Sequence, residues 1–233
     1  MTALLYLDGM PVAVETGGAS RRARLTVEAD GALRVSAGSD VAESELEAFL
    51  ASKRAWVYRK LAEKEPLLDE PVAKELVDGE GFLYLGRSYR LRLTDDGRTV
   101  RLDRGRILLP RTLAATGTEH VISWYQRCGR AWLRPRMGGW AARLRVEPGP
   151  LDVADLGRKW GSATGSRVRI HWAMLQLSPA LIDYVLVHEL AHLHEPHHGP
   201  AFWRVVARVM PDYDERKGEL ARRGAGLWFG GAA

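Results

Sequence analysis

The chain has almost no cysteine and no long uninterrupted apolar segment. Cys128 is the single cysteine among 233 residues, so an internal disulfide and a zinc site built on thiolates are both excluded. The longest apolar stretch, residues 181–193, is interrupted by four charged or histidine residues and falls short of the roughly 20 residues that a membrane-spanning helix needs. We therefore expect no transmembrane helix, and we expect any transition metal to be held by histidine and carboxylate side chains.

The N-terminus lacks the basic start of a secretory signal peptide, and Asp8 interrupts its short apolar run, which predicts a cytoplasmic protein. Apolar residues make up 46% of the chain and charged residues 27%, as in globular proteins with one or two domains. Basic residues number 34 and acidic residues 29, which leaves a formal net charge of +5. A surplus of that size, counted over the whole chain, is a weak indication of a nucleic-acid partner.

The first half of the chain predicts mainly β-structure. Alternating apolar and polar side chains predict a hairpin at residues 24–35, turning at Asp30-Gly31. Apolar residues at helical spacing, preceded by a capping-box pair, predict a helix over residues 44–61. Short strands between residues 82 and 109 then predict a small antiparallel meander.

The rest of the chain combines helix and strand. Apolar spacing predicts a helix around residues 121–132, and strands are predicted at residues 151–156 and 168–172. We therefore predict an α+β fold in two parts. Residues 1–110 form a β-rich N-terminal subdomain with one long helix, and residues 111–233 form a second domain.

Five of the seven histidines lie in an eleven-residue segment, residues 188–198. The segment follows a helix start at Ser178-Pro179, and no glycine or proline interrupts residues 181–193. Pro196 disfavours helix at the residue before it. The pattern predicts a helix of about four turns that ends just after His194.

His188 and His192 lie one turn apart on this helix and point the same way, as two imidazoles that bind one ion must. Glu189 lies about 100° around the helix, too far to complete a regular ligand set but near enough to reach a water molecule on that ion. This is the general-base position of the HExxH arrangement.

Two ligands leave a metal site incomplete. His198 follows His192 by six residues, beyond a chain reversal at Pro196, and is the predicted third ligand. If His198 does not bind, Glu195 or a residue near Tyr213 is the alternative. Three protein ligands and one open position are typical of a catalytic zinc site. His194 and His197 either orient substrate or stand beside the site without a role.

The sequence around this helix resembles a known family. Its most specific segments are Arg158-Lys159-Trp160-Gly161-Ser162, Arg169-Ile170-His171-Trp172, residues 183–193, His198, and Phe202-Trp203. They are similar to the YgjP-like metallopeptidase family, whose relatives include the SprT-type zinc proteases. The similarity extends upstream through residues 21–35, 48–57 and 84–89, so it covers nearly the whole chain.

The resemblance implies one zinc ion per chain, held by His188, His192 and His198, with Glu189 activating the bound water. It also implies that residues 111–233 form a zincin-like catalytic domain that contains the HExxH helix.

The chain departs from the family pattern at several positions near the site. Ala163 stands where the family usually has cysteine. This difference argues that the family cysteine is not needed for the chemistry. Asparagine is common in the family at the positions of His171 and His197, and serine at the position of Gly199. None of these changes removes a predicted ligand.

The expected chemistry is metal-assisted hydrolysis, in which zinc lowers the pKa of its water toward 7 and Glu189 transfers the proton to the leaving nitrogen. Candidates for binding substrate or the oxyanion are His171, Arg167, His197 and Tyr184. The sequence does not select among them.

Substrate class depends on the strand at residues 168–172. If it is an edge strand, it can pair with an extended peptide, which predicts a peptidase that cleaves flexible or unfolded polypeptide; an ordinary sheet strand is the alternative. A zinc hydrolase of a small amide or ester is a second candidate function. The third is a DNA-associated protease module, favoured by basic clusters at residues 21–24 and 127–136.

Overall fold

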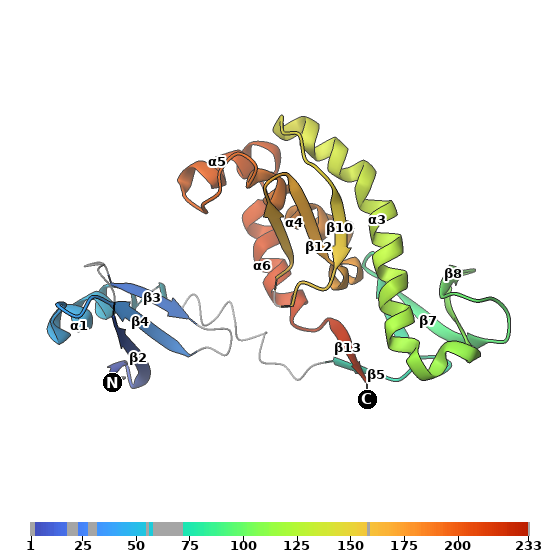
Figure 1. The fold of residues 1–233 in the computed structure, drawn as a ribbon, viewed down its shortest axis with the longest axis horizontal. Coiled ribbons are helices and arrows are strands. Elements are labelled where there is room, and N and C mark those ends of the chain that lie inside the picture. The colour runs from blue at the N-terminus through green and yellow to red at the C-terminus, as the bar shows by residue number, and fades with distance from the viewer. Residues whose placement is uncertain are drawn as a thin grey trace. The chain divides into compact units, whose positions relative to one another are not determined.

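The computed structural model describes residues 3–17, 23–27, 32–54, 56–57, 72–157 and 159–232. The chain forms two compact units, Met1–Glu70 and Pro71–Ala233 (Figure 1). Each unit has its own hydrophobic core.

The boundary at residue 70 corrects the predicted division at residue 110. Strands between residues 81 and 110 bury Phe82, Ile107 and Leu109 in the same core as the helical residues that follow them. A change from strand-like to helix-like sequence therefore marks a change of element inside one unit, not a domain boundary.

The first unit is a four-stranded sheet with one helix. Its elements are β1 (Ala3–Leu7), β2 (Met10–Thr16), β3 (Arg24–Val27), β4 (Leu33–Ala37) and α1 (Glu43–Ser52). The strand order is β1-β2-β4-β3, and β2 pairs with β4 in parallel. Alternate residues of the inner strands, such as Val12, Val14 and Val35, are fully buried. The sheet therefore has one core face and one exposed face.

Two local features of this unit differ from the sequence prediction. Strands β1 and β2 form a hairpin around Asp8 and Gly9, which both have positive φ, as a type I′ turn requires. Helix α1 begins after Ala42, and Ser44 makes no capping bond. The predicted pairing of β3 with β4 is confirmed, whereas the Asp30-Gly31 turn and residues 58–61 of the predicted helix lie outside the described residues.

The second unit contains a four-stranded sheet that differs from the predicted antiparallel meander. Its strands are β6 (Gly81–Tyr84), β7 (Arg87–Thr94), β8 (Arg101–Asp103) and β9 (Arg106–Pro110). The order is β6-β7-β9-β8, with β7 parallel to β9. Positive-φ pairs close two hairpins, at Leu85-Gly86 and Arg104-Gly105. The turn at Asp96-Gly97 lies between β7 and β8, which do not pair with each other; β9 lies beside β7 instead.

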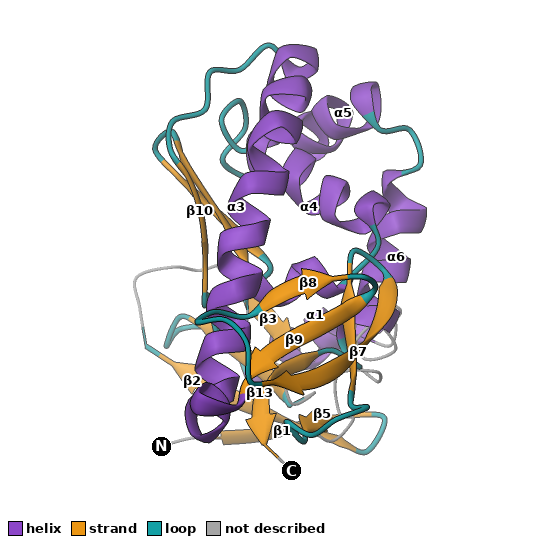
Figure 2. Ribbon diagram, turned by 90° about the vertical axis from the view of Figure 1, so that its right-hand side faces the viewer, coloured by secondary structure: helices purple, strands orange, loops and turns teal. Residues whose placement is uncertain are grey.

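The rest of the second unit is an α+β arrangement. Its elements are β5 (Val72–Lys74), η2 (Arg111–Thr116), α3 (Gly117–Leu144), β10 (Leu151–Ala154), β11 (Gly161–Thr164), β12 (Arg167–His171), η3 (Trp172–Gln176), α4 (Pro179–Ala191), α5 (Pro200–Val209), α6 (Tyr213–Gly224) and β13 (Trp228–Ala232). Helices α3 and α4 pack against each other and against the small sheet β10-β12-β11 (Figures 1 and 2). Strand β13 returns to pair in parallel with β5.

The small sheet places β12 at its centre and β11 at one edge. In β12, Val168 and Ile170 are buried while Arg167 and Arg169 are exposed, so only one face of the sheet is covered. The proposal that residues 168–172 form an edge strand is therefore wrong. Alternation of apolar and polar side chains indicates that one face of a strand is buried. It does not indicate whether the strand pairs with one or two other strands.

Aromatic side chains fill the centre of the second unit. Trp124 and Tyr125 of α3 are buried with Trp172 and Trp228, and the rings of Tyr125 and Trp172 lie 5.7 Å apart. These aromatic side chains of α3 therefore pack in the core. None of the helices in the described ranges is both long enough and apolar enough to cross a membrane.

Candidate active site

Helix α4 carries the histidine segment and is buried along most of its length. Pro179 occupies its first turn, as predicted, and Ser178 is extended but makes no side-chain capping bond. The helix ends at Ala191, three residues before the predicted end. Backbone bonds from Leu193 to Leu190 and from His194 to Ala191 skip only three residues, which tightens the final turn.

Two polar contacts fix α4 against α3. Asp183, only 6% exposed, accepts two hydrogen bonds from the Arg136 guanidinium, at 2.8 and 2.6 Å. Beyond the other end of α4, the His194 ring lies 2.8 Å from the Leu144 carbonyl oxygen at the end of α3. Because a carbonyl only accepts, His194 Nε2 carries the proton. His194 therefore positions the segment after α4, a role that the sequence did not predict.

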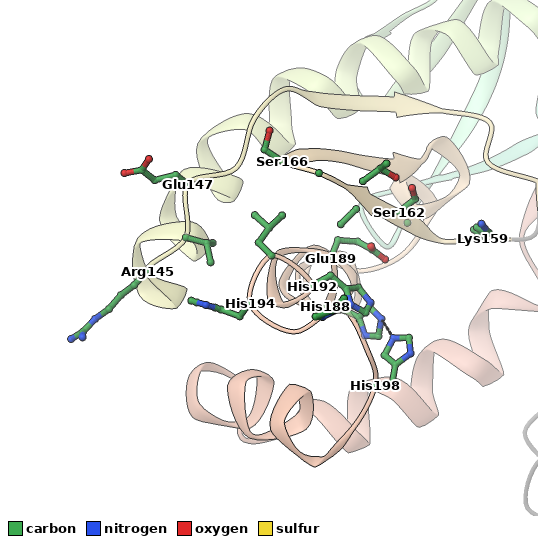
Figure 3. A pocket seen from close by; sticks show the side chains of 17 residues that line it. Arg145, Glu147, Lys159, Ser162, Ser166, His188, Glu189, His192, His194 and His198 are labelled. Carbon is green, nitrogen blue, oxygen red and sulfur yellow. Dashed lines mark hydrogen bonds between the residues drawn. The ribbon is translucent and has the colours of Figure 1, made fainter.

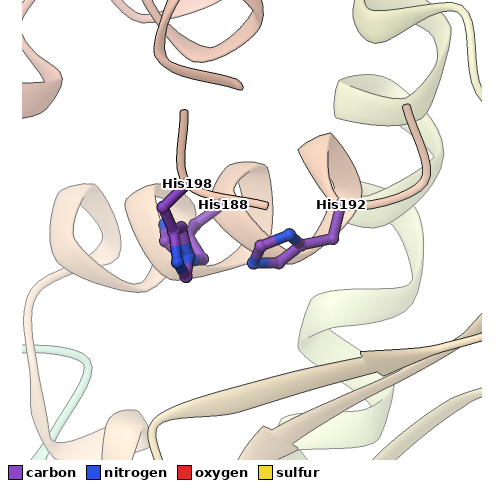
Figure 4. Close-up of side chains that lie close together, drawn as sticks. All are labelled: His188, His192 and His198. Atoms are coloured by element: carbon purple, nitrogen blue, oxygen red, sulfur yellow. The ribbon is translucent and has the colours of Figure 1, made fainter. Parts of the chain in front are cut away.

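The predicted metal ligands lie together (Figure 4). His188, His192 and His198 each offer a ring nitrogen, and the three nitrogens lie within 4.8 Å of one another. The Nε2 atoms of His188 and His198 are 2.9 Å apart. Two nitrogens bound tetrahedrally to one zinc ion would be about 3.3 Å apart, so the spacing of this pair fits a shared ion.

Hydrogen bonding and burial leave ring nitrogens in the form that binds metal. His192 Nδ1 lies 3.1 Å from the carbonyl oxygen of Glu195, so Nδ1 holds the proton and Nε2 keeps its lone pair. Burial, followed by the neighbouring His198, lowers the pKa of His188 to about 3. The imidazole of His188 is therefore neutral near pH 7. Glu195 contributes its backbone to His192, and the metal-ligand cluster found among the described residues does not include its carboxylate.

Glu189 is held against strand β11. Its side chain is 6% exposed, and a Cβ atom on Gly161 would lie 2.6 Å from both Cγ and Oε1 of Glu189. Burial raises the pKa of Glu189 to about 7, although a hydrogen bond from the Ala163 N–H and the charge of Lys159 both lower it. A carboxyl group with a pKa near 7 is suited to accept and return a proton at neutral pH.

A cleft of about 1050 Å³ lies over these residues and is open to solvent. Helix α4 forms one wall with the histidines and Glu189, and β11 with the turn at residues 165–166 forms the other (Figure 3). Residues 145–147 and His194 line the end beyond α3. No strand was predicted for Gly161–Thr164, and only the family resemblance at Trp160-Gly161-Ser162 indicated that this segment matters.

The predicted substrate-binding residues are not brought to this cleft. His171 is 2% exposed, its Nδ1 accepts a bond from the Ala173 N–H, and its Nε2 lies 3.4 Å from Asp155. Arg167 and His197 are exposed, and neither lines the cleft. Tyr184 lies one turn before His188, with ring centroids 6.1 Å apart, and burial raises the pKa of its phenol.

The predicted basic cluster on α3 is largely occupied by contacts within the chain. Arg127 donates to the Val100 carbonyl and Arg130 to the Val153 carbonyl, while Arg136 pairs with Asp183. The rings of Trp132 and Trp140 are covered by Arg136 and Arg143. These groups are therefore poorly placed to stack on bases. Of the other cluster, Arg21 and Arg22 lie outside the described residues.

Comparison with known proteins gives one family. The family model described as YgjP-like, metallopeptidase domain, matches residues 21–223. Among solved structures, the metallopeptidase zymogen of Pyrococcus abyssi abylysin is similar at 20% identity and a TM-score of 0.38, over 41% of this chain and 98% of that chain. No curated protein matches the chain. Because the family match spans most of the sequence, the chain belongs to the YgjP-like family of metal-dependent peptidases.

Proposed function

We propose that the protein is a zinc-dependent peptidase that cleaves flexible or unfolded polypeptide bound in extended form along β11. The observation that carries this proposal is one open cleft that contains the three-histidine cluster, Glu189 and the edge strand β11. A peptidase needs a hydrolytic centre and a surface that recognises peptide backbone, and these residues offer both.

The residues present fit zinc as the metal. Three imidazoles, from His188, His192 and His198, match the three protein ligands of catalytic zinc sites. A bound zinc ion would polarise the substrate carbonyl and lower the pKa of a water molecule. The chain itself supplies the proton transfer. Glu189 accepts the proton of the attacking water and delivers it to the leaving nitrogen.

Strand β11 supports an extended polypeptide as the substrate. Strand β11 pairs with β12 on one side, and none of the described strands pairs with its other side. The Ala163 N–H of β11 donates to Glu189, so the strand lies directly beside the proposed base. An extended peptide can therefore add to the sheet through backbone hydrogen bonds beside the metal ligands. The open cleft also favours a long substrate, whereas a site for a small amide or ester encloses its ligand.

The metal assignment is tested by metal analysis of purified protein. Wild type should contain about one zinc per chain, and His188→Ala and His198→Ala should lose most of it. If His198→Ala retains zinc as tightly as wild type, His198 is not the third ligand.

The role of Glu189 is tested by Glu189→Gln, which preserves shape. This variant should retain zinc while hydrolysis falls by about 10²- to 10⁴-fold. Loss of zinc from Glu189→Gln would place Glu189 among the ligands and contradict its assignment as the base.

The substrate class is tested with a mixed peptide library and a panel of small amides and esters. We expect cleavage of unfolded polypeptide, weak cleavage of folded proteins, loss of activity with a zinc chelator and recovery with added zinc. If wild type hydrolyses small amides or esters but cuts no peptide, the peptidase proposal fails and a general zinc hydrolase replaces it.

A further inference from the structure

Two segments of the chain carry a surplus of positive charge, residues 81–111 and residues 127–145. Several arginines of the second segment already make contacts within the chain. Residues 81–111 contain eight arginines, three aspartates, and no lysine or glutamate. This segment therefore has a surplus of five positive charges, equal to the formal net charge of the whole chain. The segment coincides with the sheet β6-β7-β9-β8 and its turns.

The strand register places four of these arginines on one face of the sheet. Leu91 and Ile107 pair across β7 and β9 and are buried. Their neighbours along the strands therefore point outward. Arg90, Arg92 and Arg106 are such neighbours, and Arg101 joins them because it pairs with Leu108, the residue after Ile107. We call Arg90, Arg92, Arg101 and Arg106 the arginine face. Figure 2 shows the strands β7, β9 and β8 that carry it.

Carboxylates within the described residues do not neutralise the arginine face. Arg90 and Arg101 donate to the backbone carbonyls of Gly79 and Asp96, which leaves their charges uncompensated. Arg92 and Arg106 are exposed, and neither forms a hydrogen bond or ion pair within the described part of the chain. Asp103 lies opposite Arg106 in register, but no ion pair joins them there.

The strand register also places two positive charges opposite each other. Arg90 lies directly across from Arg106 on the neighbouring parallel strand, an arrangement that destabilises a sheet unless the charges are compensated. An anionic ligand bound over both strands would compensate them.

We propose that the arginine face binds the phosphodiester backbone of a nucleic acid. All of its cations are arginines, and the planar guanidinium forms paired hydrogen bonds to phosphate oxygens. Outward side chains recur about every 4.8 Å between strands and about 6.8 Å along a strand, which gives a two-dimensional array of charges suited to successive phosphates.

The composition of the face disfavours other anionic partners. No aromatic side chain lies among its outward positions, and Leu83, 38% exposed, is its one large exposed apolar residue. Protein interfaces are anchored by aromatic and apolar side chains, and peripheral membrane binding also needs apolar groups that insert. Since bases have no ring on which to stack, binding should depend on the backbone and little on sequence.

The test measures binding of full-length protein to a labelled 20-base-pair DNA duplex, with single-stranded DNA and double-stranded RNA of the same length as further arms. The test variant, called the arginine-face variant, carries both Arg92→Gln and Arg106→Gln. The control is Arg204→Gln with Arg208→Gln, which removes two exposed arginines from α5 that have no recorded partner in the described residues.

We expect wild-type binding to weaken linearly on a log–log plot against salt. The arginine-face variant should bind about tenfold more weakly at low salt, and its salt slope should be lower by about two, one per lost phosphate contact. The control should keep the wild-type slope. Which nucleic acid binds most tightly identifies the type preferred.

A stability measurement separates binding from misfolding. Because Arg106 faces Arg90, the variant should melt no lower than wild type. The proposal is overturned if wild type shows no salt-dependent binding to any of the three nucleic acids, or if the variant keeps the wild-type slope. It is also overturned if wild type binds vesicles containing phosphatidylserine but no nucleic acid. None of these results depends on peptidase activity.

Discussion

Gly161 sets the position of the proposed general base. Any Cβ at this position would overlap the Glu189 side chain, since the space between β11 and α4 is filled by that carboxylate. Gly161 has no positive φ, so the need for glycine is steric and not conformational. Gly161 is therefore a positioning residue.

We predict that Gly161→Ala lowers kcat by about tenfold or more, because a displacement of about 1 Å is costly in an active site. Zinc content should be unchanged, since the substitution contacts the base and not the ligands. Gly138→Ala is the matched control, because a Cβ there meets nothing within 4 Å. Wild-type kcat in Gly161→Ala would show that Glu189 does not need its present position.

Glu189 also makes the stability of metal-free protein depend on pH. Its pKa in the fold is about 7, against an ordinary value of 4.5, because burial disfavours the charged form. The unfolded chain therefore ionises first as pH rises. The contribution of Glu189 to stability is fully present below pH 4.5 and is lost as pH rises through 7.

We predict that metal-free Glu189→Gln gains stability over metal-free wild type as pH is raised from 4.5 to 7, by on the order of 3 kcal/mol. Chemical denaturation across this range measures the difference. Zinc-loaded samples should show a smaller difference, because a cation stabilises the nearby carboxylate. A difference that does not change with pH would contradict the role of burial.

At the scale of elements, the Arg136–Asp183 pair holds α3 to α4. Asp183 is nearly buried, and the pair is bidentate, with Arg136 also stacked on Trp132 at 4.3 Å. Removal of one partner leaves the other charge without compensation in a partly dry site.

We predict that Asp183→Ala destabilises the protein by about 2 kcal/mol, less than a fully buried pair would give, because Arg136 is partly exposed. Glu219→Ala, which breaks an exposed pair with Arg223 on α6, should cost about 0.5 kcal/mol or less. Equal effects in urea denaturation would show that burial adds nothing to the Arg136–Asp183 pair.

Elements with a strong local signal were predicted well, and their neighbours in space were not. The spacing of His188, His192 and His198 depends on helix geometry and on one short reversal, so sequence alone brought them together. Strand β11, in contrast, has the sequence Gly-Ser-Ala-Thr, which has no alternation. It is a strand because β12 pairs with it, which is a tertiary cause.

Sheet order was also beyond the sequence. The turn pairs Leu85-Gly86 and Arg104-Gly105 determine hairpins locally, but the parallel contact between β7 and β9 is set by packing of both hairpins on one core. In the same way, His171 was a candidate substrate-binding residue from the sequence, but in the fold it lies buried beside Trp160 and Phe229.

At the scale of the whole molecule, the two four-stranded sheets share one topology. In each, two antiparallel hairpins lie side by side and their inner strands pair in parallel, in the orders β1-β2-β4-β3 and β6-β7-β9-β8. The first sheet closes its core with α1, whereas the second closes its core with α3. Similar topology therefore serves two separate cores, and only the second core supports the cleft.

This division predicts that the site is complete within residues 71–233. Among the described residues, all that line the cleft belong to that unit, and none of its core residues belongs to the first unit. A chain of residues 71–233 should therefore fold, bind about one zinc per chain and hydrolyse peptides with a kcat within about threefold of the full chain, since every proposed ligand, the base and the edge strand are retained.

Zinc analysis, thermal unfolding and peptide hydrolysis of residues 71–233 check this prediction. The same chain with Glu189→Gln is the control for contaminating peptidases. If the shortened chain folds and binds zinc but hydrolyses peptides at least a hundredfold more slowly than the full chain, the first unit takes part in substrate binding or catalysis. In that case the cleft of the second unit is not sufficient for the activity, and substrate must also contact residues before Pro71.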